Sequence, residues 1–129
     1  MYLIDTDVII DVLRKVEGSR EFILELVKEG AFISTVTIAE LFSGRDTRDP
    51  IKREKLLRFL SHFEALSVTT EIAVLAGELR RDYGLSLGDA IIAATATVYG
   101  LTVATGNVKH FGRIKDLPVL VPPYRNSKG

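Results

Sequence analysis

Short apolar runs alternate along the chain with segments of helical periodicity, and this alternation constrains the fold more than any other feature of the sequence. The apolar runs lie at residues 2–4, 31–33, 66–68, 101–104 and 119–121. Hydrophobic residues recur at spacings of three and four in the segments 6–13, 22–30, 37–42, 50–63, 71–83 and 86–99. Runs that do not alternate with polar residues are typical of strands buried on both faces. The pattern therefore predicts an α/β domain with a central parallel sheet of four to five strands.

The length of 129 residues and the hydrophobic share of 47% are those of one packed domain. A domain of this size buries roughly two-thirds of the surface of its unfolded chain, so it needs no disulfide or structural metal for stability. The absence of cysteine excludes thiol nucleophiles and zinc–thiolate sites. We therefore expect one domain over residues 1–129, with residues 124–129 as a flexible tail.

Neither a secretory signal nor a membrane span is predicted. The chain begins MYLID, with a carboxylate and no basic residue at the start. The longest uncharged stretch, residues 90–108, contains two glycines and changes its periodicity midway, so it is interpreted as a buried helix followed by a buried strand. These features predict a cytoplasmic protein that does not associate with membranes.

Acidic and amide side chains follow the predicted strands. Asp5 and Asp7 come after the first apolar run, Glu40 lies in the helix after the second, and Asp89 lies in the first turn of the segment 86–99. Asn107 comes shortly after the fourth run. Because the carboxyl ends of parallel strands meet at one edge of a sheet, we expect these side chains to converge there.

Helix capping is the plainer alternative for each acid taken singly. Ser86 with Asp89, and Thr37 with Glu40, both fit the capping-box spacing, in which the acid reaches back to the amide of the first residue. Residues 5–7 could likewise be an acidic helix start. Capping does not explain why all of these acids lie at one predicted edge.

Convergence of the acids would require a positive charge or protonation. Three carboxylates within about 4 Å of one another repel by roughly 12 kcal/mol at an effective dielectric constant near 20. That energy rivals the stability of a small domain, about 5 to 15 kcal/mol. An all-oxygen ligand set favours Mg²⁺ or Mn²⁺ over zinc. Such an ion activates water for attack on a phosphodiester, and the sequence contains no phosphate-binding glycine loop that would indicate a nucleotide-binding site instead.

Four segments resemble, in order and spacing, the signatures of PIN-domain ribonucleases, and most closely those of VapC-type toxins of toxin–antitoxin pairs. The segments read LIDTD at 3–7, ISTVTIAEL at 33–41, LGDAIIAA at 87–94 and ATGNVKHF at 104–111. The resemblance extends from residue 2 to about residue 121. It implies a PIN-like three-layer α/β/α sandwich.

The resemblance also implies a Mg²⁺- or Mn²⁺-dependent endoribonuclease in which Asp5, Glu40 and Asp89 hold the metal. Asn107 stands at the position of a fourth acid in the catalytic set, which removes one negative charge and puts a second metal in doubt. The hydroxyl and supporting positions of the motifs correspond to Thr6, Asp7, Ser34 and Thr105.

The partners implied by the resemblance are an RNA substrate, a second copy of the chain in a homodimer, and a VapB-type antitoxin. The antitoxin would cover the acidic pocket, and operator DNA would be bound only through the antitoxin.

A basic rim would have to outweigh the acids for RNA to bind. Residues 45–58 carry six basic and three acidic side chains, although the whole chain has a net charge of zero. The candidate phosphate contacts are Arg45, Arg48, Lys52, Arg53, Lys55, Arg58, Lys109 and Arg113. Single-stranded or looped RNA is the expected target because its backbone can bend into a cleft. An ordinary solvated helix face is the alternative for each of these residues.

Two other functions remain open at this point. The opening segment also fits a haloacid-dehalogenase-type phosphatase with Asp5 as nucleophile. Alternatively, the chain is a catalytically weak PIN-like module that binds RNA or a partner without cutting, a reading that the neutral Asn107 makes conceivable.

Overall fold

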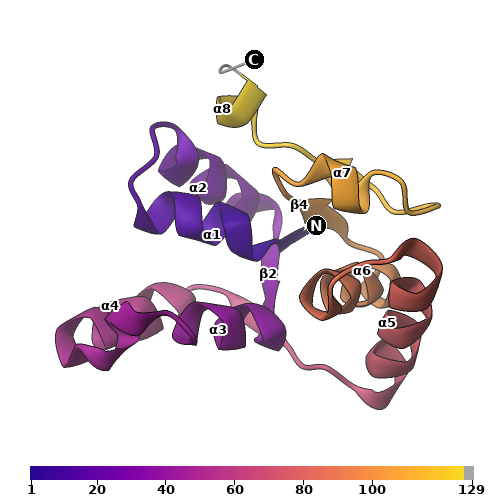
Figure 1. The fold of residues 1–129 in the computed structure, drawn as a ribbon. Helices are drawn as coiled ribbons and strands as arrows, with labels where there is room; N and C mark the ends of the chain where they lie inside the picture. Colours follow the sequence, from indigo (N-terminus) through magenta and orange to yellow (C-terminus); the bar gives the residue numbers. More distant parts are fainter. Residues whose placement is uncertain (127–129) are drawn as a thin grey trace.

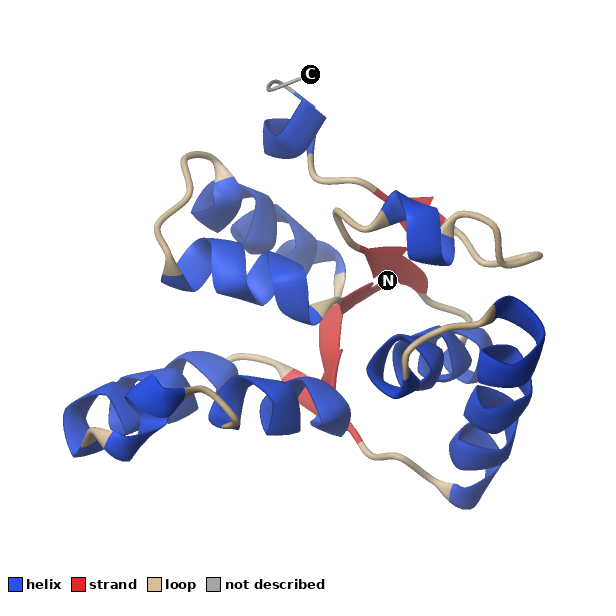
Figure 2. Ribbon diagram, in the orientation of Figure 1, coloured by secondary structure: helices blue, strands red, loops and turns tan. Residues whose placement is uncertain are grey.

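The computed structural model describes residues 1–126, which fold around one parallel sheet in the order β3-β2-β1-β4-β5 (Figures 1 and 2). All four strand pairs are parallel, as the sequence predicts. The strands are β1 (Tyr2–Ile4), β2 (Ala31–Ser34), β3 (Glu64–Leu66), β4 (Thr102–Ala104) and β5 (Val119–Leu120).

Helices cover both faces of the sheet, which gives the three-layer arrangement predicted from the sequence (Figure 1). The helices α1 to α4, with the short 3₁₀ helix η1, lie on one side, and α5, α6 and α7 lie on the other. The helices are α1 (Thr6–Leu13), α2 (Ser19–Glu29), α3 (Thr35–Phe42), η1 (Arg45–Arg48), α4 (Pro50–Leu60), α5 (Thr70–Tyr83), α6 (Leu87–Tyr99), α7 (Val108–Phe111) and α8 (Pro123–Asn126).

The central strand β1 shows why its apolar run does not alternate with polar residues. Leu3 packs into the core beneath α5 and α6, and its neighbour Ile4 packs into the core beneath α1 and α2. Both side chains are completely buried. A strand buried on both faces needs hydrophobic residues at every position, and this is the pattern read from the sequence.

The register of the strands brings the site residues to one edge. Ile4 is paired with Ala104 across β1 and β4, so Asp5 and Thr105 follow at the same level of neighbouring strands. The amide of Asp5 donates to the carbonyl of Ala104 at 3.0 Å, which continues this pairing. On the other side of β1, the register with β2 places Ser34 beside Asp5. The carboxyl edge of the sheet is therefore set by backbone hydrogen bonds.

The third strand lies two residues earlier than predicted. The run 66–68 was expected to form it, but β3 ends at Leu66, and Val68 is 38% exposed. Because β3 is an edge strand that pairs with β2 alone, it exposes Glu64 and Ala65 and lacks the continuous apolar run of a central strand.

The face of α4 that packs into the core is narrow. Leu56 and Leu60 are buried, together with Phe63 just beyond the helix, whereas Leu57 is 48% exposed. Positions four residues apart face the core together, and Leu57 lies on the next, outward-facing row.

The C-terminal residues differ from the predicted tail starting at residue 124. Residues 124–126 belong to α8, and the Tyr124 hydroxyl donates to Asp11 Oδ2 at 2.7 Å. A tertiary contact with α1 orders this segment, and nothing in its local pattern indicates that. Residues 127–129 of the predicted tail lie outside the described part of the chain.

Residues 90–108 form α6, β4 and the loop that follows, in agreement with the reading of a buried helix and a buried strand. No helix within residues 1–126 is both long enough and apolar enough to cross a membrane.

Candidate functional site

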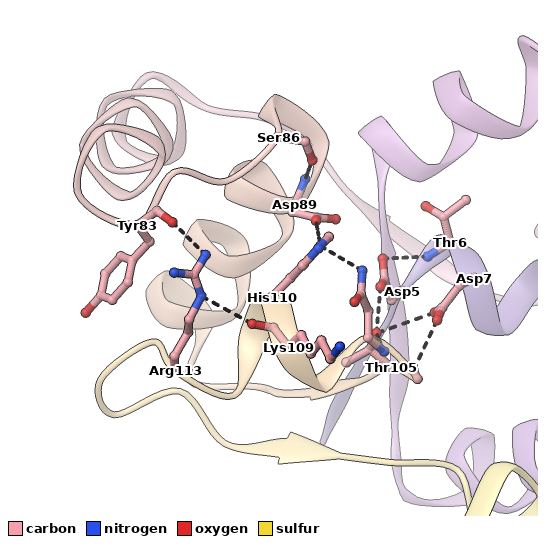
Figure 3. A network of polar contacts seen from close by, with 12 residues as sticks. Asp5, Thr6, Asp7, Tyr83, Ser86, Asp89, Thr105, Lys109, His110 and Arg113 are labelled. Atoms are coloured by element: carbon pink, nitrogen blue, oxygen red, sulfur yellow. Dashed lines mark hydrogen bonds and ion pairs between the residues drawn. The ribbon is translucent and has the colours of Figure 1, made fainter.

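Asp5 lies at the end of β1 and is the N-cap of α1. Its Oδ1 accepts a hydrogen bond from the Thr6 amide, and its Oδ2 accepts one from Thr105 Oγ1, both at 2.8 Å. The residue is only 5% exposed. Figure 3 shows its carboxylate between Thr6 and Thr105. Asp5 therefore caps α1 and also lies at the carboxyl edge of the sheet, so the cap does not exclude the predicted role in a site.

The surroundings of Asp5 disfavour its negative charge. Burial raises its pKa to about 7, the charge of Asp7 contributes to this increase, and Asp89 adds a smaller one. The hydrogen bonds from Thr105 and Thr6 act in the opposite direction. The raised pKa means that these surroundings favour the protonated form of Asp5, and a positive charge next to it would favour the ionised form.

Asp7 lies two residues after Asp5 and contacts the loop after β4. Its Oδ2 accepts a hydrogen bond from the Gly106 amide at 3.1 Å and lies 3.4 Å from Arg125 Nη2. Burial raises the pKa of Asp7, while the charge of Arg125 and the Gly106 hydrogen bond lower it. Asp7 thus links the start of α1 to the loop that carries Thr105.

Glu40 is directed at the start of α1 and does not serve as a helix cap. Thr6 Oγ1 donates to Glu40 Oε1 at 2.7 Å and lies 3.1 Å from Thr37 Oγ1. The helix begins earlier than predicted, because the Ser34 hydroxyl accepts from the Val36 amide at 3.1 Å and caps α3. The predicted capping box of Thr37 and Glu40 is therefore wrong.

Asp89 lies in the first turn of α6, where the Ser86 hydroxyl caps the helix by accepting from the Asp89 amide at 3.2 Å. The Asp89 carboxylate points to α7 instead of back to the cap, with Oδ2 2.6 Å from His110 Nδ1. Figure 3 shows the Asp89 carboxylate directed at His110. The same His110 nitrogen lies 2.8 Å from Asn107 Nδ2. Ser86 caps the helix as the capping-box spacing predicts, whereas the Asp89 carboxylate does not return to the cap.

Glu40 and Asp89 lie on the same side of the molecule. A Cβ added to Gly88, the residue before Asp89, would lie 2.8 Å from Glu40 Oε2. The start of α6 and the end of α3 are therefore in contact at this point, which the four-motif arrangement requires.

A chain of contacts joins the predicted site residues. Thr6 contacts both Glu40 and Asp5. Thr105 bonds Asp5 and accepts from the Asn107 amide at 2.9 Å. His110 then contacts both Asn107 and Asp89. Ser34 is the exception, since it is completely buried and caps α3.

Sequence reasoning missed four contributors to the site. They are Thr37, Gly88, Gly106 and Arg125. His110 follows Asn107 by three positions, about one helical turn, and this spacing is a sequence signal that the two side chains share a face. Arg125 gave no such signal, because it lies in the segment interpreted as a tail.

The members of the candidate basic rim differ in their contacts. Lys52 and Lys55 line a cleft of about 550 Å³ that also reaches Glu40, and Lys52 Nζ lies 3.5 Å from Asp46 Oδ1 in the same cleft. Arg53 lies over the Phe42 ring, 5.1 Å from its centroid. Arg113 instead donates to the backbone carbonyls of Tyr83 and Lys109, and so holds the loop after α7 against α5. Lys52 and Lys55 are therefore the best-placed phosphate contacts near the acids.

The carboxylate oxygens of the site are ligands that Mg²⁺ or Mn²⁺ prefers, but they are not arranged as a complete coordination site. Asp5, Glu40 and Asp89 supply carboxylate oxygens from three elements. Over residues 1–126, however, no three His, Asp or Glu side chains are placed to hold one ion together. Asp89 is engaged with His110, so a metal at Asp89 would have to compete with that contact.

The comparison with known families decides the identity of this fold. Residues 2–117 match the PIN domain family. The chain belongs to the PIN domain family. The resemblance noted in the sequence is thereby confirmed over nearly the whole chain.

Relatives of this PIN domain carry toxin and ribonuclease names. This PIN domain is 40% identical over 133 residues to ribonuclease VapC10 of Mycobacterium tuberculosis, and the match covers 97% of this chain and 98% of the relative. Among solved structures, a toxin–antitoxin complex from Klebsiella pneumoniae matches with a TM-score of 0.78 at 27% identity, covering 95% of this chain and 98% of that one. DNA-bound VapBC from Salmonella typhimurium matches with a TM-score of 0.79 at 26% identity, covering 93% and 96%.

The phosphatase alternative does not agree with these findings. The family match is to the PIN domain. In addition, Asp5 is almost completely buried, and both of its carboxylate oxygens already accept hydrogen bonds. A nucleophile must reach its substrate, and the burial of Asp5 does not suit that role.

Proposed function

We propose that this PIN domain is a Mg²⁺- or Mn²⁺-dependent endoribonuclease that acts as the toxin of a toxin–antitoxin pair. The observation that carries the proposal is Asp5, a carboxylate at the edge of the sheet whose pKa is raised first by burial and then by the charges of Asp7 and Asp89. The ribonuclease name of the relative at 40% identity supports the same activity.

The metal would be held by Asp5, Glu40 and Asp89. When bound, it supplies an activated water for attack on the scissile phosphodiester and neutralises the charge that develops there. The residues around the acids orient them: Thr105 and the Thr6 amide hold Asp5, and the Thr6 hydroxyl holds Glu40. These contacts keep two of the three carboxylates in place before the reaction begins.

The proposed substrate is single-stranded or looped RNA. Lys52 and Lys55 line the cleft next to Glu40 and would bind backbone phosphates on the approach to the acids. An unpaired strand can bend its backbone into such a cleft, whereas a stiff duplex cannot.

A VapB-type antitoxin is the proposed protein partner. Similar folds have been solved as toxin–antitoxin complexes, one of them bound to DNA. In this proposal the antitoxin covers the acidic cleft and contacts operator DNA, and the toxin forms a homodimer.

Cleavage of RNA by the purified protein, freed of any antitoxin, tests the proposal. Cutting is expected with Mg²⁺ or Mn²⁺ and is expected to stop in EDTA. Asp89→Asn should reduce the rate at least roughly a hundredfold, because it removes one of the charges that hold the ion. Asp82→Asn, on the exposed surface of α5, is the matched control and should cut like the parent.

Undiminished cleavage in EDTA would contradict the metal requirement. A preparation that binds RNA or the antitoxin but cuts nothing with either ion would favour the binding-module alternative. That alternative has a specific observation behind it, the neutral Asn107, which lies in the contact chain where the family pattern often has an acid.

The contact between Gly88 and Glu40 provides a second test, because it separates stability from activity. Gly88→Ala should leave the fold intact or raise the free energy of unfolding by up to about 1 kcal/mol, since alanine favours a helix more than glycine does. The added methyl group must displace the Glu40 carboxylate, so the cleavage rate should fall roughly tenfold.

Thermal unfolding and single-turnover cleavage measure the two effects of Gly88→Ala. Gly77→Ala in α5 is the control, because a Cβ there would meet no other atom within 4 Å. It should match the stability gain without the loss of rate. Equal rates for both variants would mean that the position of Glu40 does not matter.

A further inference from the structure

The C-terminal helix α8 is attached to α1 through Asp11. Arg125 places both Nε, at 2.9 Å, and Nη2, at 2.7 Å, on Asp11 Oδ2. The Tyr124 hydroxyl donates to the same oxygen at 2.7 Å, and the Tyr124 ring meets the Phe22 ring edge-on, with 5.9 Å between centroids. The side chain of Arg125 is thus held in one place, and Figure 1 shows α8 close to the ends of α1 and α2.

From this position the Arg125 guanidinium reaches the acidic edge of the sheet. Its Nη2 lies 3.4 Å from Asp7 Oδ2, the oxygen that also accepts from the Gly106 amide. The guanidinium also lies directly against Gly106, where an added Cβ would collide with it. Arg125 therefore contacts both partners of the hydrogen bond that ties the start of α1 to the loop after β4.

The contacts of Arg125 with Asp7 and Asp11 also place a positive charge among several acids. Asp5, Asp7 and Asp11 lie within seven consecutive positions of the chain. Within residues 1–126, the salt bridges to any of these three acids are both made by Arg125. Asp11 and Asp7 repel each other, and Arg125, which contacts both, offsets that repulsion.

We propose that Arg125 is a positioning residue of the active site, which holds Asp7 and the loop 105–107 in the arrangement that presents Thr105 and Asn107 to the site. The inference rests on the proposed ribonuclease function and concerns how that site is kept in order. Arg125 acts through Asp7 and Gly106, and its clamp on Asp11 fixes it to α1. Helix α8, the last helix of the described chain, therefore helps to keep the active site in order.

Two substitutions disturb the same contact from opposite sides. Arg125→Met keeps most of the side-chain length but removes the charge and the donors. Gly106→Ala leaves every charge in place and displaces the guanidinium through the added methyl group. Arg125→Lys restores the charge without the forked geometry. Arg81→Met is the matched control, because Arg81 pairs with the adjacent Asp82 on the exposed face of α5.

The first measurement is steady-state RNA cleavage, at a temperature where every variant is folded. Arg125→Met and Gly106→Ala are expected to lower kcat about tenfold while KM changes by less than about threefold, because the loop rather than RNA binding is disturbed. Arg125→Lys should recover part of the loss, and Arg81→Met should behave like the parent.

The second measurement does not depend on catalysis. The amide resonance of Gly106 in a ¹H–¹⁵N correlation spectrum should shift in Arg125→Met, and its hydrogen exchange should accelerate, because its acceptor Asp7 is no longer held. The resonance should stay in place in Arg81→Met.

An unchanged Gly106 resonance together with an unchanged kcat in Arg125→Met would overturn the inference. So would a loss of kcat that disappears once it is corrected for the folded fraction. If the parent protein cuts no RNA, the proposed function fails by itself, and an unmoved Gly106 resonance would then show separately that Arg125 does not hold the loop.

Discussion

Replacing Asp5 with asparagine is expected to abolish RNA cleavage and, at the same time, to raise the free energy of unfolding of the metal-free protein at pH 7. Asp5 is 5% exposed, and its pKa is raised from 3.8 to about 7. The folded protein therefore carries an unfavourable carboxylate charge, which the amide removes while keeping the shape of the side chain. A shift of this size corresponds to about 4 kcal/mol, so we expect a gain of about 2 to 4 kcal/mol.

The pH dependence of this gain follows from the direction of the pKa shift. Between about pH 4 and pH 7 the unfolded chain has lost the Asp5 proton while the folded protein retains it, so the parent loses stability as the pH rises through this range. Asp5→Asn does not titrate at this position. The stability difference between the two proteins should therefore be small near pH 4, should grow towards pH 7 and should level off above it.

Urea unfolding from pH 4 to pH 8 in EDTA measures the difference, and cleavage of RNA in Mn²⁺ measures the loss of activity, which should be at least roughly a hundredfold. Asp82→Asn provides the control, because Asp82 is exposed beside Arg81 and its pKa is lowered rather than raised. A variant of Asp5 that is less stable than the parent at pH 8 would show that the buried charge is not the dominant cost.

Replacing Phe111 with alanine is expected to cause the largest loss of stability. Phe111 is the largest completely buried side chain among the described residues, and it packs from the four-residue helix α7 into the core beneath α5 and α6. Truncation of a buried phenylalanine costs about 3 to 5 kcal/mol through lost burial and the cavity that remains. That is a large part of the total stability of a domain of this size, about 5 to 15 kcal/mol.

The same substitution should also reduce RNA cleavage, because α7 carries His110 and follows Asn107 directly. Denaturant unfolding gives the stability, and cleavage under conditions where the variant is folded gives the separate effect on the site. Val108→Ala, in the same helix but 45% exposed, should change stability by less than about 0.5 kcal/mol. Similarly small losses of stability for both variants would mean that the packing of Phe111 does not hold α7 in place.

The sequence by itself determined the layers of this protein and most of the candidate site. The central strands β1 and β4 are buried on both faces, so their apolar runs are unambiguous, and Asp5 and Thr105, which follow them, come to one edge because parallel strands end together. Glu40 and Asp89 lie in the helices α3 and α6, and the motifs of the sequence pointed to them. The edge strand β3 was placed less well because it is covered only in part and its pattern is weak.

Only the tertiary structure decided which acids cap a helix and which pair with a basic side chain. Arg125 bonds Asp11 across 114 positions of the chain, and Thr105 bonds Asp5 across 100. No local pattern encodes such contacts, because they depend on where helices pack after the sheet has formed. The ends of the strands could be read from neighbouring residues, whereas the arrangement of charges around Asp5, and with it the raised pKa, arises from side chains that folding brings together.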